Sequence, residues 1–585
     1  MSETDTPIAT GRPEGFGLPR RLLRSPLPAR LARRWGPAAG EWAAGLVPAV
    51  LFTLWARTIT DNPVARDGQI AGLASLQFRL AVLGIPLLAA VALISLRATA
   101  PVRQSAVRYA APAVAGLVSG FLAGGLVFML RGTPWPINGF SGDTGRLIYW
   151  TGSVIRTGSF QDIYPPGIPH FAAWVAENFY GGDARLVFKP LLIALIAVTC
   201  PLVYLAWRML LKPLPALGVA VLGTVSQYMP YKQYSPLILL LLIPVIGKLA
   251  QWLRGSPSFS LKGALLRGLW LGVMNGVLFM TYSGWHVFSF PGTVALVLCF
   301  FPWRKAGREG RIKGLLLLGG TGAAFLAISG SYALKMLRAS GTKDLWCSQI
   351  TLTQPAYIGE GPFSLTSWNK PGEYPDFSST FAGMNLFTIA MVVGLGLAVA
   401  LGLRRPAVAT LVACFGGAWL MRFYFASRMV KDQNIRLFPH TTFEIQYTLT
   451  ALAVLGCVLA VERLGLLAKA VTLLTREREA ALPGLPSLSS LPGLQPVRLA
   501  AVGALAALLL AGGLAGSATN DEYMPAPPSE HTGGSLAWAA HQIRKPDGQC
   551  PRYANKGVCT TPPANPVLVK VITTGPLVCR EIWDQ

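Results

Sequence analysis

The sequence predicts an all-α integral membrane protein, built as a bundle of about 13 transmembrane helices. Three observations support this fold class. Of the 585 residues, 52% are hydrophobic and 13% are charged, about half the charged share of an average soluble domain. The mean hydropathy is +0.46. The apolar residues also gather in runs long enough to cross about 30 Å of hydrocarbon, which takes about 20 helical residues.

About thirteen such runs follow one another along the chain. The seventh and eighth are separated only by Ser283-Gly284-Trp285, so a count that is lower by one is the alternative. The runs centre on residues 41–57, 78–96, 109–130, 187–207, 214–229, 235–252, 267–284, 286–303, 314–335, 384–402, 406–423, 442–461 and 498–516.

The charged residues predict how these helices are oriented. The chain has 51 Lys and Arg against 26 Asp and Glu, a net charge of +25. The cations form short clusters between apolar runs and do not gather on one folded face, so they do not indicate nucleic-acid binding. Because cationic loops stay in the cytoplasm, we expect a multi-pass protein of the cell membrane with its N-terminus inside, its C-terminus outside and no cleavable signal peptide. The inner clusters lie in residues 20–34, 97–108, 208–212, 254–267, 304–313, 404–405 and 463–478.

This orientation divides the chain into five parts. They are a basic cytoplasmic segment (1–40), a transmembrane domain (41–461), a Pro-rich flexible cytoplasmic linker (462–497), a last transmembrane helix (498–516) and an outer tail (517–585) that we expect to form a small cap. Within the transmembrane domain, residues 131–186 form the first large outer loop.

The cysteines agree with an outer tail. Cys550, Cys559 and Cys579 lie in it, and an oxidising exterior favours a disulfide among them. The pairing stays open, because Cys347 in another outer loop is a fourth candidate. Metal binding by these residues is the rival interpretation, although no Cys-x-x-Cys spacing is present. The other cysteines, Cys200, Cys299, Cys414 and Cys457, fall in apolar runs and are expected to pack as small hydrophobic residues.

The first large outer loop contains the leading catalytic candidate. Asp143 follows the third run directly, lies between glycines and precedes Arg146. A carboxylate held at the membrane surface in this way is a candidate general base. The alternative is structural, since Asp is a favoured N-cap and a helix is predicted to begin at Thr144.

Further along the same loop, Asp162 and Tyr164 precede a tight turn and an amphipathic stretch at 168–180. That stretch is too short to span a membrane, and its aromatic residues predict a helix lying in the interface. Such a helix beside an acidic site suits an enzyme with a lipid-linked substrate, and Asp162 and Tyr164 are candidate substrate contacts. A purely structural connection between two spans would look similar.

Cations of the outer segments are candidates for holding a phosphate. Lys189 enters the start of the fourth run, where a cation needs an anion or must reach the interface. Arginine binds phosphate through two charge-assisted hydrogen bonds at once. Contact with lipid headgroups is the structural alternative for each cation. The candidate phosphate ligands are Lys189, Arg146, Arg185 and Arg436, with Arg428 and Lys431 nearby.

Aromatic residues gather in two further outer segments, the turn 228–234 and the connection 282–286. Aromatic faces stack on sugars, so these segments predict a sugar platform. An aromatic belt at the membrane interface has the same composition. The candidate substrate contacts here are Tyr231, Lys232, Trp285 and His286. The polar connection 424–441 is a candidate second wall of the site.

Four short motifs together resemble the actinobacterial galactan 5-O-arabinofuranosyltransferase family, which primes arabinan synthesis in the mycobacterial-type cell wall. The resemblance covers about residues 135–290, and beyond residue 300 only the general layout is similar. The motifs are Gly142-Asp143-Thr144-Gly145-Arg146, Tyr164-Pro165-Pro166-Gly167, Phe188-Lys189-Pro190 and the Tyr-rich turn 228–234.

The resemblance implies a GT-C glycosyltransferase, a multi-spanning enzyme that takes a sugar from a polyprenyl phosphate on the outer face. It implies that Asp143 is the loop acid, that Lys189 contacts the donor phosphate and that decaprenyl phosphoarabinose is the donor. The acceptor, a cell-wall polysaccharide or a natural product, stays open because the C-terminal part looks shorter than is usual in the family.

The predicted activity is therefore inverting transfer of an arabinofuranosyl residue, with membrane lipid, the donor and the acceptor as partners and no residue assigned to a metal. Weak assistance by a divalent cation is an open alternative. Two rival functions are kept. One is a mannosyltransferase that uses polyprenyl phosphomannose, and the other is a multi-pass transporter or lipid flippase, which would place ionisable residues in the middle of its spans.

Overall fold

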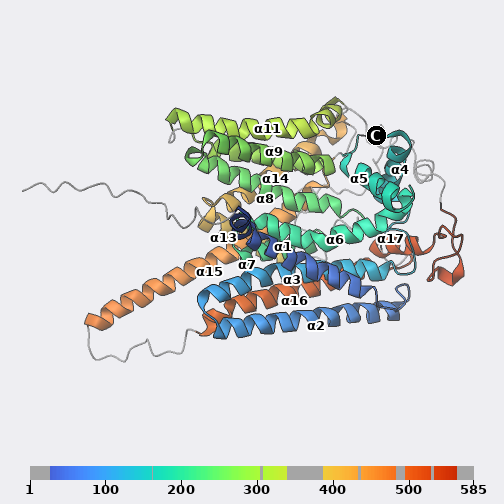
Figure 1. The fold of residues 1–585 in the computed structure, drawn as a ribbon, viewed down its shortest axis with the longest axis horizontal. Helices are drawn as coiled ribbons and strands as arrows, with labels where there is room; N and C mark the ends of the chain where they lie inside the picture. The colour runs from blue at the N-terminus through green and yellow to red at the C-terminus, as the bar shows by residue number, and fades with distance from the viewer. Residues whose placement is uncertain are drawn as a thin grey trace, which may run out of the picture.

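The computed structural model describes residues 27–160, 163–303, 307–338, 386–432, 437–481, 495–528 and 532–562. Within these ranges the chain is α-helical, and the β-pairing consists of one isolated bridge between Ile543 and Thr560. Most of the long helices lie side by side along one direction (Figure 1).

Ten helices in the described ranges are long and apolar enough to cross a membrane. They are α1 (Leu27–Ala56), α2 (Arg66–Arg97), α3 (Ala100–Met129), α6 (Ala184–Arg208), α8 (Tyr234–Gly255), α9 (Leu261–Thr281), α11 (Gly307–Arg338), α14 (Pro406–Asp432), α15 (Thr441–Ala481) and α16 (Gln495–Glu522). Three apolar helices are shorter: α7 (Pro213–Ser226), α10 (Gly284–Phe300) and α13 (Leu386–Gly402).

Each predicted apolar run falls on one of these helices, and the seventh and eighth runs are separate helices, α9 and α10. The prediction of an all-α, multi-pass membrane protein is therefore confirmed. The number of crossings stays a prediction, because α7, α10 and α13 are shorter than the about 20 residues that a full crossing takes.

One end of the bundle carries three helices that do not span, α4 (Gly142–Thr157), α5 (Gly167–Phe179) and α17 (Thr532–His541), at the right of Figure 1. We call it the cap end. The α5 helix exposes Phe171, Trp174 and Phe179, as expected for an interfacial helix.

The C-terminal segment packs on the first large loop at this cap end. The backbone N–H of Asn138 donates to the carbonyl of Leu536 at 2.8 Å, and the Thr133 hydroxyl donates to the carbonyl of Ala540 at 2.7 Å. A disulfide joins Cys550 to Cys559, which answers the open question of pairing for these two residues. Cys347 and Cys579 lie outside the described residues.

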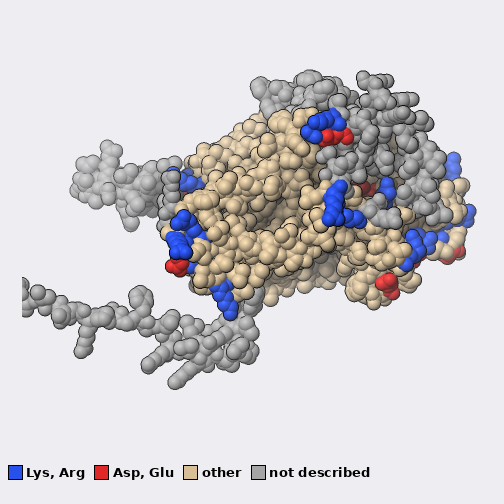
Figure 2. Space-filling view, turned by 90° about the horizontal axis from the view of Figure 1, so that it is seen from above, with Lys and Arg blue, Asp and Glu red and all other residues tan. Residues whose placement is uncertain are grey.

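The opposite end, which we call the basic end, collects the other ends of the same helices. Here the buried Glu41 of α1 pairs with Arg108 of α3 and Arg208 of α6, and Arg405 pairs with Glu462. Figure 2 shows a broad surface with few charged side chains between the Lys and Arg side chains at the left of the view and those toward the right. The three paired arginines belong to three of the predicted inner clusters, 97–108, 208–212 and 404–405. The compartment that each end faces stays a prediction.

The sequence prediction is wrong about where the cytoplasmic linker begins. Residue 462 was expected to start a flexible connector, yet α15 continues to Ala481. The reason is local, since residues 462–481 consist mainly of Leu, Ala, Arg, Glu and other good helix formers, and the first proline, Pro483, comes after them.

Small residues let α9 and α11 approach closely. Gly268, Gly272 and Gly276 recur every four residues on α9, so they form one stripe. A Cβ atom at Gly272 would lie 2.3 Å from the backbone oxygen of Thr321, and one at Gly268 would lie 2.3 Å from that of Leu317. Backbones in such contact leave no room for a side chain.

We expect Gly272→Leu to separate α9 from α11 and to destabilise the protein by about 1–3 kcal/mol, the usual cost of overpacking. The matched control is Gly319→Leu, because a Cβ atom there meets nothing within 4 Å. Thermal unfolding in detergent should show a lower melting temperature for the first variant only. Equal melting temperatures for the two would contradict this packing.

Candidate functional site

An ion pair at the cap end joins two segments that the sequence analysis had singled out. The ammonium nitrogen of Lys232 lies 2.9 Å from a carboxylate oxygen of Asp143. The Lys232 side chain is 11% exposed and that of Asp143 is 46% exposed. The cation is thus nearly buried, and about half of the Asp143 side chain is exposed, so a substrate can reach it.

The α4 helix fixes the position of Asp143. It begins at Gly142, whose φ of +56° suits a residue without a side chain. The N-cap residue is Ser141, so the alternative that Asp143 is the N-cap is wrong. Asp143 lies instead in the first turn, where the positive end of the helix dipole favours a carboxylate.

Lys232 lies in a turn that is recessed into the bundle. The preceding helix, α7, has 14 residues, which makes it about 21 Å long and shorter than the about 30 Å hydrocarbon core. The turn 227–233 that follows it is therefore surrounded by neighbouring helices, and Gln227, Lys232 and Gln233 are all buried. The Gln233 side chain steadies the turn by accepting a hydrogen bond from the backbone N–H of Met229 at 3.0 Å.

Tyrosines surround the ion pair. The hydroxyls of Tyr164 and Tyr234 are hydrogen-bonded to each other, which joins the predicted substrate contact Tyr164 to the start of α8. The Lys232 nitrogen lies 5.5 Å from the ring centre of Tyr282. The backbone oxygen of Tyr231 accepts from the Thr144 hydroxyl of α4 at 3.4 Å. The Tyr-rich turn and the loop acid thus form one cluster.

Trp285 and His440 form a further wall of the cluster. The Trp285 indole nitrogen donates to the backbone oxygen of Ser235 at 2.7 Å, and its ring centre lies 6.2 Å from that of His440. His440 lies in the predicted second wall, 424–441, directly before α15. It interacts electrostatically with both Asp143 and Lys232, so the described part of this connection does reach the site.

The charges of the cluster settle its protonation state. Burial raises the pKa of Asp143, but the nearby Lys232 cation outweighs burial and brings that pKa below its usual value of 3.8. Burial lowers the pKa of Lys232, yet Asp143 and the tyrosines leave it well above 10.5. Burial lowers the pKa of His440 to about 4. At neutral pH the site therefore holds a carboxylate, an ammonium and a neutral imidazole.

The structure does not bring two of the predicted phosphate ligands to this ion pair. The Lys189 ammonium donates to the backbone oxygens of Leu130 and Thr133 at 2.8 and 2.5 Å. Arg185 pairs with Asp183, its neighbour in the loop, at 2.7 Å. Both cations thus have local partners that the sequence did not reveal, and their role as phosphate ligands stays a prediction without support from this geometry.

Arg146 is better placed, because it follows Asp143 by three residues on α4 and so shares a face with it. Two other predicted residues, Asp162 and Arg436, lie outside the described residues. Within the described ranges, no group of three or more His, Cys, Asp and Glu side chains is arranged to hold a metal ion.

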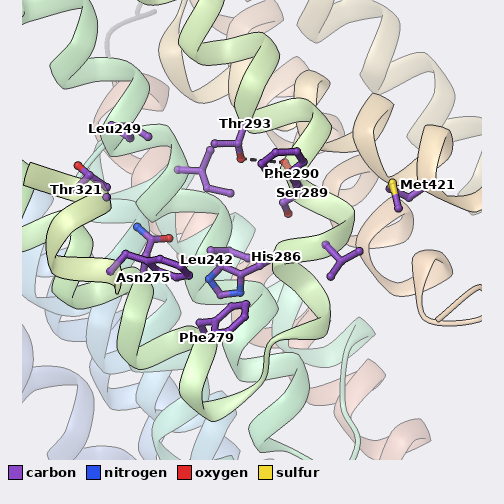
Figure 3. A pocket seen from close by; sticks show the side chains of 14 residues that line it. Leu242, Leu249, Asn275, Phe279, His286, Ser289, Phe290, Thr293, Thr321 and Met421 are labelled. Atoms are coloured by element: carbon purple, nitrogen blue, oxygen red, sulfur yellow. Dashed lines mark hydrogen bonds between the residues drawn. The ribbon is translucent and has the colours of Figure 1, made fainter. Parts of the chain in front are cut away.

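His286 is separated from the cluster. Its ring projects into a cavity of about 580 Å³, between Asn275 and Phe279 of α9 (Figure 3). The cavity is bounded by α8, α9, α10, α11 and α14 and is mainly apolar. Trp285, the preceding residue, faces the site instead, because successive residues of an α-helix point about 100° apart. Of the two predicted substrate contacts, Trp285 therefore lies beside the Asp143 cluster, and His286 lies in the apolar cavity.

Tyr282, Tyr234 and His440 are the members of the cluster that were not selected as site residues from the sequence. Tyr282 and Tyr234 belong to the two aromatic segments that predicted a sugar platform. The amino-acid composition therefore indicated these segments, although it did not indicate the two residues. The clearer signal was Lys232. A cation between two apolar runs requires a nearby anion, and Asp143 was the leading outer carboxylate.

Comparison with known proteins adds no assignment. No protein-family model matches the chain, and no curated protein matches it. The functional argument therefore rests on the Asp143 cluster and on the motifs that resemble the arabinofuranosyltransferase family.

The unequal burial of the ion pair predicts unequal effects of its two single variants at pH 7. Asp143→Asn leaves a buried ammonium without an anion and should lower the melting temperature more than Lys232→Met, which leaves a half-exposed carboxylate. The double variant should recover much of the loss, as in a double-mutant cycle of a coupled pair.

The pH dependence follows from the shifted pKa values. Because the folded-state pKa of Asp143 is below 3.8 and that of Lys232 is above 10.5, their mutual stabilisation is complete between these values. It disappears as pH falls through the folded-state pKa of Asp143 and as it rises through that of Lys232. Thermal unfolding across pH should show the Asp143→Asn penalty shrinking at the acid end. A penalty independent of pH would argue against the pair.

Proposed function

We propose that this protein is a membrane glycosyltransferase that transfers an arabinofuranosyl residue from a polyprenyl phosphate donor to a cell-wall polysaccharide or related acceptor on the outer face of the cell membrane. One observation carries the proposal. A half-exposed, ionised carboxylate, Asp143, is held by a buried ammonium, Lys232, at the recessed cap end of a membrane bundle.

The ion pair suits a displacement at an anomeric carbon. Asp143 accepts the proton of an acceptor hydroxyl while that oxygen bonds to the anomeric carbon, and the bond from this carbon to the phosphate oxygen breaks on the opposite face. The products are an inverted glycoside and the polyprenyl phosphate. A base placed in this way contributes about 10²–10⁴-fold in rate.

Lys232 has a second part in the same step. Before reaction its charge is balanced by the Asp143 carboxylate at 2.9 Å. When Asp143 takes up the proton and becomes neutral, the Lys232 charge is no longer balanced by it and adds a positive field while negative charge develops on the phosphate that is leaving on the opposite face. A preorganised cation in a poorly hydrated site is effective in this role. Arg146 shares the Asp143 face of α4 and is the next cation along it.

Aromatic side chains border the ion pair. Tyr164 comes from the first large outer loop, and Tyr282 and Trp285 come from the connection 282–286. Tyr282 and Trp285 are buried, whereas the Tyr164 ring is partly exposed and can stack on the apolar face of a sugar. Burial raises the pKa of Tyr164, so its hydroxyl stays protonated at neutral pH and can hydrogen-bond to a sugar hydroxyl.

The family resemblance supports the same assignment. Two of its four motifs, the one around Asp143 and the Tyr-rich turn 228–234, are the two segments that the ion pair joins. Motifs that are far apart in the sequence are expected to meet when they serve one site. The resemblance also favours decaprenyl phosphoarabinose as the donor, with polyprenyl phosphomannose as the alternative.

A transporter or flippase is the rival of a different class. Such proteins handle ions and substrates on charged groups near the middle of their spans. Here Glu444 lies in the first turn of α15, and Lys189 lies in the second turn of α6. Both are close to the cap end of their helices. This placement favours chemistry at the boundary over passage through the bundle.

The test is transfer of label from polyprenyl phosphoarabinose in isolated membranes, run in parallel with polyprenyl phosphomannose. We expect transfer from the first donor, and Asp143→Asn should lower the rate at least about 10²-fold, the share of a general base. The amount of folded protein is measured for each variant, because Asp143→Asn also weakens the ion pair.

The matched control is Asp183→Asn. It removes the same charge in the same loop, and Asn is a good replacement at this N-cap of α6, so its activity should stay near that of the wild type. Full activity of folded Asp143→Asn would end the base assignment. Transfer from the mannose donor alone would make the protein a mannosyltransferase.

A further inference from the structure

A cavity of about 620 Å³ opens at the basic end, far from Asp143 along the helices. It lies between the N-terminal turns of α3, the end of α6, the start of α7 and α16. Its lining contains four cations and no carboxylate, and the lining residues are Arg103, Gln104, Val107, Arg108, Arg208, Lys212, Pro213 and Ala501.

A buried carboxylate behind the cavity fixes two of these cations. Glu41 of α1 is 3% exposed. It pairs with Arg108, and it accepts from the Arg208 Nε at 3.0 Å. Arg208 also donates to the backbone oxygen of Leu211 at 2.6 Å. Both guanidinium groups are therefore held in place before any ligand arrives, which reduces the entropy that binding costs.

The other two cations are Arg103 and Lys212. Among the described residues, neither of these side chains makes a hydrogen bond or an ion pair. Together the four cations and Glu41 give this region a charge of +3 (four positive, one negative). Lys212 is the N-cap residue of α7, so the positive end of that helix dipole adds to the field. In the described part of the chain, Glu41 is the carboxylate that pairs with these cations, so the cavity keeps a net positive charge.

The position of the cavity indicates where the anion comes from. Arg103 lies in the first turn of α3, Arg208 is the last residue of α6, and Lys212 directly precedes α7. All three lie where apolar helices end, which is the depth of lipid phosphates in a bilayer. Val107, Pro213 and Ala501 add an apolar side to the cavity, along which the glycerol and upper acyl chain of a lipid can lie.

We propose that this cavity binds the phosphate headgroup of an anionic phospholipid from the membrane leaflet at the basic end. Basic pockets between spans at the cytoplasmic side are suited to such headgroups. The chemistry is charge-assisted hydrogen bonding from two fixed guanidinium groups and two free cations to one phosphodiester. The proposal uses no residue of the Asp143 cluster and is independent of the proposed transferase activity.

The experiment is native mass spectrometry of the full chain in neutral detergent, titrated with dioleoyl phosphatidylglycerol and, separately, with dioleoyl phosphatidylcholine. The test variant is Arg103→Gln/Lys212→Gln, which removes the two free cations and leaves the Glu41 network intact. Each cation near a membrane surface contributes about 1 kcal/mol, so the double variant should bind phosphatidylglycerol about 30-fold more weakly, at about 1.4 kcal/mol per factor of ten.

The matched control is Arg97→Gln/Lys262→Gln. Both residues are exposed, belong to the predicted inner clusters and do not line the cavity, so phosphatidylglycerol binding should stay at the wild-type level. A third variant, Arg103→Lys/Lys212→Arg, keeps both charges and should retain binding. Retention of full affinity by the Gln double variant would overturn the site.

Inorganic phosphate distinguishes a lipid from a soluble anion. We expect it to compete with phosphatidylglycerol only weakly, because it lacks the glycerol and acyl chain that the apolar side of the cavity accommodates. Inorganic phosphate that displaces the lipid at equal concentration would overturn the lipid proposal. So would equal binding of phosphatidylcholine and phosphatidylglycerol to the wild-type protein.

Discussion

Lys232 is the buried cation on which the arrangement of the cap end depends. Removing an ammonium group from water costs hydration free energy, and a nearby anion offsets that cost. The anion comes from α4, a helix of the first large loop. The ion pair therefore fixes that loop against the end of the bundle. Because the amine is the more deeply buried partner, about half of the Asp143 side chain stays exposed while the pair is formed.

The lengths of two helices make this arrangement accessible. The α7 and α10 helices have 14 and 17 residues, fewer than a full crossing of about 20. Their cap-end connections are buried, with Gln227, Lys232 and Gln233 after α7 and Tyr282 and Ser283 before α10. The turn that carries Lys232 and the connection that carries Tyr282 lie in the resulting recess. Catalytic chemistry at a membrane surface benefits from such a recess, which excludes bulk water and strengthens charge interactions.

The apolar runs predicted where the helices lie, because the length and hydropathy of a span are local properties. The end of α15 was wrongly predicted, although 462–481 contains good helix formers, because the prolines from Pro483 onward are typical of a flexible linker. Asp143 and Lys232 were each predicted from the sequence as site residues. Their contact with each other was not predicted. Lys189 shows the reason, because its partners are the backbone oxygens of Leu130 and Thr133. Which backbone oxygens come within reach of Lys189 depends on the tertiary structure, and the amino-acid composition carries no signal for it.

The attachment of the C-terminal segment to the first large loop bears on how the protein is made. Thr133 and its hydrogen-bond acceptor in Ala540 are 407 positions apart, and Asn138, five residues before Asp143, has its backbone partner in the same late segment. The ribosome must therefore deliver every span before the loop acquires its final neighbours. Until the segment around Ala540 has been made, Asp143 lies on a loop that lacks its final neighbours, so under the proposed function we expect no transfer before that point.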